Sequence, residues 1–365
     1  MSAAVRLIAL ALCSACTTGV DADLPSGVRI EPVVEGLDEP WGIGVLPNGA
    51  LLVTERAGRL RLFRDGALSD VAGLPEVAVA GQGGLLDITP ARDFATSRTL
   101  FLTYATPQSG GSGTALASAR LSADATRLEA LRVLFEMAPG SSGGRHFGSR
   151  VVEAPDGTLF VTIGDRGDRP SSQDLDRHNG SVIRVTRDGS VPPDNPFAGS
   201  AGARPEIWSY GHRNPQGAGL DANGTLWISE HGARGGDEVN RIEKGANYGW
   251  PVISYGVHYS GARIGEGTAK EGMEQPALYW DPSIAPSGLL VYQGEMFPDW
   301  QGDIFVGSLK FDYISRIEVD GDTAREAEQI EAAETGRVRD IVKAPDGSIL
   351  FLSVTDGTLY RLTRD

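Results

Sequence analysis

The amino-acid sequence predicts an all-β protein, and within that class a six-bladed β-propeller. The first observation is composition: the 365 residues include 48 glycines and 21 prolines. These residues separate short segments rich in Val, Ile, Leu and aromatic side chains, a pattern typical of many strands joined by tight turns. The second observation is a hairpin pattern that recurs along the chain.

Each plain copy of the pattern is an apolar run, a turn and a second apolar run. We expect type I′ turns in these copies, because Asn-Gly and Asp-Gly suit a turn in which both central residues have positive φ. Two looser copies, 83–105 and 288–310, have a longer loop in place of the turn. The plain copies are 39–63 with the turn Asn48-Gly49, 148–165 with Asp156-Gly157, 218–232 with Asn223-Gly224, and 339–362 with Asp346-Gly347.

Six hairpins spread over the chain imply units of about 55 residues, long enough for four strands and a functional loop, as in a propeller blade. We therefore predict one six-bladed domain over residues 28–365. A β-sandwich or two smaller barrels are the alternatives, but no stretch resembles an interdomain linker. The longest irregular stretch, roughly 255–287, contains three tyrosines and Trp280, so we expect a packed loop there.

The N-terminal residues indicate export. Arg6 is followed by an apolar core of about ten residues and then by small residues, which is the architecture of a secretory signal and too short for a membrane span. Cleavage after Ala22 would remove residues 1–22. Alternatively, residues 12–16 resemble a lipoprotein box, and processing there would leave a lipid anchor on Cys16, the only membrane attachment that we expect. The mature protein is then periplasmic or secreted.

Two global properties limit the chemistry. The two cysteines, Cys13 and Cys16, both lie in the export segment, so we expect no disulfide in the folded domain. The formal net charge of -15 argues against nucleic-acid binding, because phosphates would be repelled. Such a charge is more typical of a soluble protein with a cation site.

Polar motifs stand just outside the predicted inner strands. A propeller gathers the loops of all its blades at one end of the central channel, so residues far apart in sequence can converge there. The motifs are GQGG (81–84), GGRHFGSR (143–150), IGDRGDR (163–169), YGHRNPQG (210–217), EHGARGGDEVNRIEKGANYGWP (230–251), SLK (308–310) and GRVRD (336–340).

Four cations in these motifs indicate an anionic ligand: Arg213, Lys310, Arg337 and Arg339. Each alone is commonly a solvated surface cation. Together, in an acidic chain, they suit carboxylate groups, which arginine binds with two parallel hydrogen bonds. Arg337 and Arg339 are two residues apart on a predicted strand, so we expect them on one face.

The chain has five histidines, and a neutral histidine titrates in the range needed to accept a proton from a hydroxyl group. The residue pattern alone does not choose among them. The histidines are His146, His178, His212, His231 and His258.

In this order, the motifs resemble those of the soluble quinoprotein sugar dehydrogenases, the aldose sugar dehydrogenase and glucose dehydrogenase group that uses pyrroloquinoline quinone (PQQ) and calcium. The resemblance runs from about residue 28 to the end of the chain. It is most specific in GHRNPQG, in GDE followed by NYGWP, and in LK with RVRD.

The resemblance implies a role for each matching residue. His146 is the expected general base, and Asp165, which a hairpin can return to its side, is expected to orient the ring. The carbonyl groups of Gly232 and Ala233 are expected to hold a cofactor-bound calcium, with Glu238 and the backbone of Tyr248 as ligands of a second, structural calcium. The expected PQQ ligands are Gln82, Arg213, Asn214, Lys310, Arg337 and Arg339.

The expected reaction is oxidation of the anomeric hydroxyl of an aldose sugar to a lactone, with electrons passing to an external acceptor. Arg145 stands where the glucose enzyme has an acidic residue, and Pro170 stands where it has a sugar-contacting glutamine, so glucose specificity does not carry over. No Cys-x-x-Cys-His motif for a c-type haem occurs. The alternatives are a calcium-dependent lactonase or esterase on the same fold, and a non-catalytic binding propeller.

Overall fold

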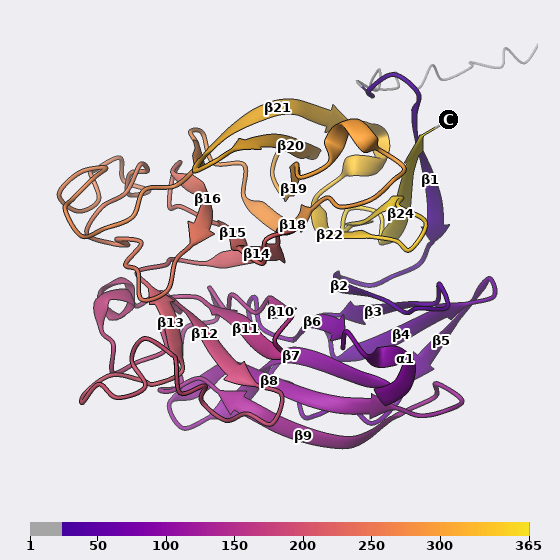
Figure 1. The fold of residues 1–365 in the computed structure, drawn as a ribbon, viewed down its shortest axis with the longest axis horizontal. Coiled ribbons are helices and arrows are strands. Elements are labelled where there is room, and N and C mark those ends of the chain that lie inside the picture. The colour runs from indigo at the N-terminus through magenta and orange to yellow at the C-terminus, as the bar shows by residue number, and fades with distance from the viewer. Residues whose placement is uncertain (1–23, 365) are drawn as a thin grey trace, which may run out of the picture.

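The computed structural model describes residues 24–364, which form six four-stranded antiparallel sheets. These sheets are the blades of a propeller (Figure 1), so the predicted fold class is confirmed. The predicted signal peptide and Cys16 lie outside the described residues. In blade order the strands are β2 (Pro40–Val45), β3 (Leu51–Glu55), β4 (Arg59–Arg64) and β5 (Ala67–Val71); β6 (Leu85–Pro90), β7 (Thr99–Gln108), β8 (Gly111–Leu121) and β9 (Leu128–Glu136); β10 (Val151–Glu153), β11 (Thr158–Ile163), β12 (Ser181–Thr186) and β13 (Ile207–Tyr210); β14 (Pro215–Leu220), β15 (Leu226–Glu230), β16 (Asp237–Ile242) and β17 (Leu278–Trp280); β18 (Pro286–Val291), β19 (Ile304–Ser308), β20 (Tyr313–Asp320) and β21 (Thr323–Glu331); β22 (Val338–Lys343), β23 (Ile349–Ser353), β24 (Thr358–Arg364) and β1 (Val28–Val34).

Helical structure within residues 24–364 is limited to α1 (Phe94–Ser97) and three 3-10 helices, η1 (Arg169–Gln173), η2 (Pro298–Trp300) and η3 (Ala333–Thr335). No helix in this part of the chain has both the length and the apolar character needed to cross a membrane.

The six predicted hairpins are the first two strands of the six blades. They pair as β2–β3, β6–β7, β10–β11, β14–β15, β18–β19 and β22–β23. The last blade takes its fourth strand from the start of the chain, because β1 pairs antiparallel with β24. Figure 1 shows these two strands side by side. The ring is therefore closed by hydrogen bonds between residues near the two ends of the described chain.

The predicted turn type was wrong in all four plain copies. Gly49, Gly157, Gly224 and Gly347 have positive φ, but the Asn or Asp before each does not. In each turn the glycine N–H bonds to the carbonyl three residues earlier, as Gly49 does to Leu46 at 2.9 Å. These are three-residue loops built from a type I turn and a left-handed glycine. Pro precedes the Asn or Asp in three of them and sets the φ that a type I turn requires.

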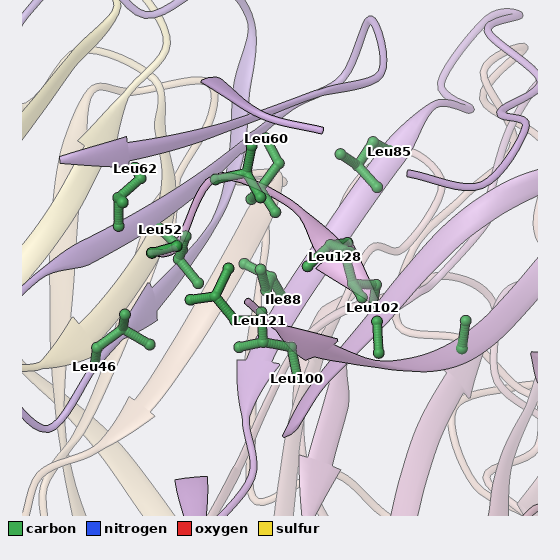
Figure 2. Close-up of a cluster of buried hydrophobic side chains, with 14 of the residues drawn as sticks. Leu46, Leu52, Leu60, Leu62, Leu85, Ile88, Leu100, Leu102, Leu121 and Leu128 are labelled. Atoms are coloured by element: carbon green, nitrogen blue, oxygen red, sulfur yellow. The ribbon is translucent and has the colours of Figure 1, made fainter. Parts of the chain in front are cut away.

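Apolar side chains fill the space between neighbouring blades. In β4, arginines alternate with Leu60 and Leu62, which are buried. These leucines pack against Ile88 of the second blade and against Leu100 and Leu102 of β7 (Figure 2). Burial of such contiguous apolar surface holds adjacent blades together and fixes the radius at which the inner strands meet the channel.

The longest irregular stretch lies between β16 and β17, residues 243–277, and it stands out from the strands in Figure 1. It is packed, as predicted, since Tyr255 stacks on Tyr279 with ring centroids 3.9 Å apart. Its predicted end was wrong, because residues 278–280 form strand β17. Tyr259 lies at a hairpin tip in this stretch and is 70% exposed.

Candidate active site

A cavity of about 690 Å³ lies where the inner strands of the blades begin. Every blade contributes to its wall, so the predicted convergence of distant motifs is observed. Its volume is in the range of small-molecule sites. The lining residues at the inner strands are Pro40, Trp41, Leu86, Phe147, Gly148, Asn214, Gln216, Ala285 and Arg339.

Beside this cavity, His146 and Asp165 form a hydrogen-bonded pair. The ring Nδ1 of His146 is 2.6 Å from Oδ1 of Asp165. Asp165 follows β11 by two residues, and Gly164 before it is required, because a Cβ there would lie 2.1 Å from the His146 carbonyl oxygen. The side chain of Asp165 is fully buried and that of His146 is 12% exposed. The hairpin thus returns the carboxylate to the histidine, as predicted.

Electrostatics keep this pair in the form of a neutral imidazole and a carboxylate. Burial lowers the pKa of His146 and Arg213 acts in the same direction, while the hydrogen bond to Asp165 opposes them. Burial alone would raise the pKa of Asp165, but hydrogen bonds from His146 and from the Gly167 N–H outweigh it, so its pKa is lowered. Within residues 24–364 the only hydrogen bond of the His146 ring is the one to Asp165, and a neutral histidine with its other ring nitrogen unengaged suits proton abstraction.

Trp250 and Arg166 fix the surroundings of the pair. The indole N–H of Trp250 donates to Oδ2 of Asp165 at 2.9 Å. The guanidinium of Arg166 lies 3.3 Å from the ring centroid of Phe147 and donates to the carbonyl groups of Gly143, at 2.6 Å, and of Arg145. These bonds hold the loop that leads into His146. Burial lowers the pKa of Arg166 to about 10.

Three of the four predicted cations, Lys310, Arg337 and Arg339, line the cavity, and the fourth, Arg213, borders a neighbouring small hollow that shares His231 with it. In residues 24–364 no ion pair joins any of them to a carboxylate; they donate instead to uncharged oxygens. The contacts are Arg213 to the His231 carbonyl at 3.1 Å, Lys310 to the Ser283 carbonyl at 3.1 Å, Arg337 to the Leu309 carbonyl at 2.7 Å, and Arg339 to Oε1 of Gln216 at 3.0 Å. Burial, with Arg150 and Arg337 nearby, lowers the pKa of Arg339 to about 9. Four cations without carboxylate partners are suited to binding an anionic ligand.

The reason given for placing Arg337 beside Arg339 was wrong, although both line the cavity. Arg337 precedes β22 with a φ of 45°, and the strand register shifts between Val338 and Asp340. The two side chains therefore do not share a face through regular alternation. The Arg337 N–H donates to Oδ1 of Asp312 at 2.8 Å, which holds this irregular backbone.

The predicted amide ligands also reach the cavity. Oε1 of Gln82 accepts the backbone N–H of His146 at 2.7 Å, which ties the second blade to the base. Oδ1 of Asn214 accepts the N–H of Gly148 at 3.3 Å. Gln82 is therefore also a structural partner of the histidine loop.

Next to this cavity, a buried ion-pair network joins the inner ends of three blades. Arg150 contacts Asp87 at 3.0 Å and Asp340 at 2.8 Å. Its guanidinium also donates to the carbonyl groups of Gln216 at 2.7 Å and Arg339 at 3.1 Å. The network therefore anchors the backbone of two cavity residues.

Two carboxylates face each other in the predicted calcium region. Glu230 of β15 is the register partner of Glu238 of β16. Only the neutral amide of Asn240 bridges them, donating at 3.0 and 3.1 Å. Burial, followed by repulsion from Glu230, raises the pKa of Glu238 to about 8. Like charges in opposed positions are unfavourable without a cation.

A small hollow of about 10 Å³ adjoins these carboxylates. Gly232 and Tyr248 border it, as do both glutamates. Ala233 instead packs with Trp250 and Ile264. No cluster of three or more metal-binding His, Cys, Asp or Glu side chains occurs in the described part of the chain, so any metal here would also need backbone oxygens.

The sequence assigned no role to four residues of the site: Gln216, Glu230, Trp250 and His231, of which His231 was expected only as a neighbour of the pocket. Each lies inside a quoted motif, Gln216 in GHRNPQG and Trp250 in NYGWP. Motif membership was therefore the available signal. Their roles come from contacts between blades, which no local pattern displays.

Comparison with known proteins places this chain and its fold among the sugar dehydrogenases. Aldose sugar dehydrogenase YliI of Escherichia coli strain K12 is 42% identical over 336 residues, covering 90% of this chain and 91% of that protein. The crystal structure of the soluble aldose sugar dehydrogenase from Escherichia coli, in the apo-form, matches with a TM-score of 0.89 at 41% identity, covering 93% of this chain and all of that one.

The chain belongs to the glucose/sorbosone dehydrogenase family, whose model matches residues 37–361. The PQQ-bound form of aldose sugar dehydrogenase from Streptomyces coelicolor matches with a TM-score of 0.77 at 26% identity, covering 94% of this chain and all of that one. The protein is therefore a sugar dehydrogenase enzyme, which argues against the alternative of a non-catalytic propeller.

Proposed function

We propose that the protein oxidises the anomeric hydroxyl of aldose sugars to lactones with PQQ and calcium and passes the electrons to an external acceptor. The observation that carries this proposal is the set of four cations without carboxylate partners in residues 24–364, placed beside the His146–Asp165 pair. Family membership supports the sugar substrate, and a PQQ-bound relative of the same fold supports the cofactor.

The residues present fit PQQ, which is an ortho-quinone with three carboxylate groups. Lys310, Arg337 and Arg339 line the main cavity, and Arg213 borders the small hollow, which shares His231 with that cavity. Nε of Arg213 is buried and lacks a hydrogen-bond partner among residues 24–364, so a donor is left for a ligand. Fixed cations can bind the carboxylates with directed hydrogen bonds.

His146 acts as the general base in this proposal. With Nδ1 engaged by Asp165, Nε2 accepts the hydroxyl proton of the sugar as a hydride leaves C1, and the C1–O bond becomes the carbonyl of the lactone. Asp165 stabilises the imidazolium that forms, and Trp250 holds the carboxylate in place. PQQ, when bound, supplies the quinone that takes up the two electrons of the hydride.

The glutamate pair fits a calcium ion. Glu230 and Glu238, with backbone oxygens near Tyr248, offer the hard oxygen ligands that calcium prefers. A second calcium at the carbonyl groups of Gly232 and Ala233 would act as a Lewis acid beside the cofactor.

Reconstitution tests the proposal. The mature protein is loaded with PQQ and calcium, passed through gel filtration, and assayed for dye reduction with a panel of aldoses. We expect retained PQQ absorbance and sugar-dependent turnover across several aldoses. Loss of the absorbance on the column, together with no sugar-dependent reduction, would reject the proposal.

A calcium-dependent lactonase on the same fold would need the metal but not the four cations. Replacing Arg337 and Arg339 with Met discriminates between them, because a hydrolase would keep its activity while the proposed enzyme would lose its cofactor. The absence of carboxylate partners for these cations among the described residues favours the dehydrogenase.

We further propose that the protein is periplasmic or secreted, with residues 28–365 as one domain. Support comes from the signal-like residues 1–22. Mass spectrometry of the mature N-terminus tests this: a peptide that begins at Asp23 indicates soluble export, and an acylated Cys16 indicates a lipid anchor. An unprocessed N-terminus would contradict export.

A further inference from the structure

A second cavity, of about 310 Å³, lies between the first two blades, at the end of the propeller opposite to the proposed active site. The main cavity is lined by Trp41 and Leu86, where β2 and β6 begin. The second cavity is lined by residues that follow the ends of these strands, among them Pro47 in the β2–β3 turn and Phe94 in α1. The two cavities share no lining residue, so the second one is a separate site.

The floor of the second cavity is part of the packed core. Leu46, Leu62 and Leu121 line it, belong to the core cluster of Figure 2, and are each at most 4% exposed. A rigid apolar surface is therefore present before any ligand binds. Space remains above it because four lining residues have short side chains, namely Ala50, Ala95, Ala123 and Ala125.

The charged residues of this lining are two arginines, Arg64 from the first blade and Arg98 from the second. Arg98 is held in place at the C-terminal end of α1, where it has a φ of 56° and its N–H donates to the Phe94 carbonyl at 2.8 Å. Its Nε donates to the carbonyl of Leu121 at 2.8 Å, and its Nη2 donates to that of Ser122. The guanidinium is therefore fixed against the wall.

Neither arginine has a strong ionic partner within residues 24–364. The side chain of Arg98 bonds there only to the two carbonyl groups. Arg64 is 3.9 Å from the carboxylate of Asp65, which is 93% exposed, and such a contact contributes little. In the neighbouring hollow, by contrast, Arg120 pairs with Glu129 at 2.8 Å. Two weakly paired cations beside apolar surface, in a chain with a net charge of -15, indicate an anionic ligand.

The lining also defines the rest of the ligand. A small inorganic anion would leave the apolar wall in contact with water, and a hydroxylated acid would bury hydroxyl groups that Asn48, the remaining polar lining residue, could not satisfy alone. A carboxylate suits guanidinium groups, which bind it with directed hydrogen bonds. A water-sized group takes about 30 Å³, so the cavity holds about ten such groups. A carboxylate on an apolar chain, with about eight carbon atoms in all, meets these conditions.

We propose that the second cavity binds a medium-chain monocarboxylate. Its carboxylate lies between Arg64 and Arg98, one cation from each blade. Its chain covers Leu46, Leu62 and Phe94. The proposal does not depend on the proposed function, because none of these residues lines the cofactor cavity. A ligand that contacts both blades and binds only the folded state also stabilises the protein.

Isothermal titration calorimetry of the mature protein with sodium octanoate tests the proposal. We expect one octanoate per chain, with a dissociation constant of about 0.1–1 mM for a ligand of this size. Octan-1-ol keeps the chain without the charge, whereas acetate and gluconate keep the carboxylate without an apolar chain. Each of these three probes should bind about tenfold more weakly or not at all.

Two kinds of substitution locate the binding. R64M and R98M each remove a cation and should weaken octanoate binding roughly tenfold, as for one hydrogen bond to a charged group. A95L adds bulk at an exposed lining residue and should block binding without changing the charge. The matched control is T96L, which places the same side chain on the next residue of α1, outside the lining. T96L should bind octanoate like the wild type.

The melting temperature gives a second measurement. Octanoate at about ten times its dissociation constant should raise the melting temperature of the wild type and of T96L, but not that of A95L. If R98M does not fold, because its side chain holds the carbonyl groups of Leu121 and Ser122, R64M and A95L decide.

Saturable binding of one octanoate that T96L keeps and A95L abolishes supports the proposal. No binding to the wild type at octanoate concentrations well above about 1 mM overturns it. Equal binding by the wild type and A95L also overturns it, because octanoate would then bind elsewhere. Equal affinity for octan-1-ol, or unchanged affinity in R64M, would reject the carboxylate between the arginines, and tighter binding of gluconate would reject the apolar chain.

Discussion

The indole N–H of Trp250 donates to Oδ2 of Asp165, the carboxylate whose other oxygen holds His146. Trp250 comes from the loop between β16 and β17 of the fourth blade, whereas His146 and Asp165 flank the hairpin of the third. Trp250 is 5% exposed. The orientation of the proposed base therefore depends on contact between two blades.

Replacing Trp250 with Phe removes the N–H and keeps an aromatic ring. Without this hydrogen bond Asp165 becomes more basic and less firmly held, so we expect kcat to fall about tenfold, within the range for one hydrogen bond to a charged group. The acid limb of the kcat/KM profile should move to higher pH, because the pKa of His146 rises. The control is W280F, which removes an indole N–H that bonds to Glu326 at 3.2 Å on the outer side of the blade. Equal profiles for both variants would contradict the role of Trp250.

The pH dependence of the wild type follows from His146. Its pKa is lowered by burial, so the neutral base persists below pH 6.5, and kcat/KM should fall only as pH drops through that lowered value. D165N removes the interactions that raise this pKa. We expect D165N to lose activity by roughly a hundredfold or more. The acid limb of the kcat/KM profile of its residual activity should lie at lower pH than in the wild type.

Replacement of Arg145 should shift the acid limb of the kcat/KM profile in the direction opposite to D165N. Its positive charge also lowers the pKa of His146, so R145Q should move the acid limb to higher pH with little change in kcat at neutral pH. Profiles of kcat/KM against pH for R145Q and D165N therefore move in opposite directions. A shift in the same direction for both would show that His146 is not the titrating base.

Arg339 tests the cation cluster. R339M removes a guanidinium that has no carboxylate partner among residues 24–364, so we expect ligand-free stability to be kept or increased while PQQ affinity falls roughly ten- to a hundredfold. Fluorescence titration and calorimetry measure the two quantities. R120M removes an exposed cation paired with Glu129 and should change neither by much. Wild-type affinity in R339M would count against an anion at this position.

Without calcium, the repulsion between the carboxylates of Glu230 and Glu238 should make the stability of the protein depend on pH. The pKa of Glu238 is raised to about 8 in the folded protein, against about 4.5 for an ordinary glutamate, so between these values the folded state binds more protons than the unfolded state. In EDTA the stability should therefore decrease as pH rises from about 5 to 8. Bound calcium should abolish this slope, and so should E238Q in EDTA. Melting temperatures across this pH range provide the measurement, with the exposed E266Q as control.

We expect Arg150 to stabilise the fold as well as to hold the backbone of the cavity residues Gln216 and Arg339. R150M leaves Asp87 and Asp340 buried without their cation, so we expect a loss of about 3–5 kcal/mol in the free energy of unfolding. Urea denaturation measures it. R325M, which breaks an exposed pair with Glu318, should cost about 1 kcal/mol or less. Similar losses in both variants would mean that the buried network does not stabilise the ring.

Local patterns determined much of this protein. All six hairpins were predictable because pairs of apolar runs close in sequence act over a few residues, and in four of them an Asn-Gly or Asp-Gly turn marks the reversal. The contact of His146 with Asp165 was predictable for the same reason, since one hairpin separates them. Even there, the turn type was not predicted: the proline before Asn48, Asp156 and Asp346 sets a φ compatible with type I and not with type I′, and the copy with Ala222 in that place forms the same turn.

Tertiary structure alone decided the rest. Closure of the ring by β1, the bond of Trp250 to Asp165 and the pairing of Arg150 with two aspartates all join separate blades or arise where they meet. Strand periodicity reports which face of a strand is buried, but not which side chain of another blade it meets. That choice depends on the packing of whole blades around the channel, where the sum of many apolar contacts sets the positions of a few polar groups.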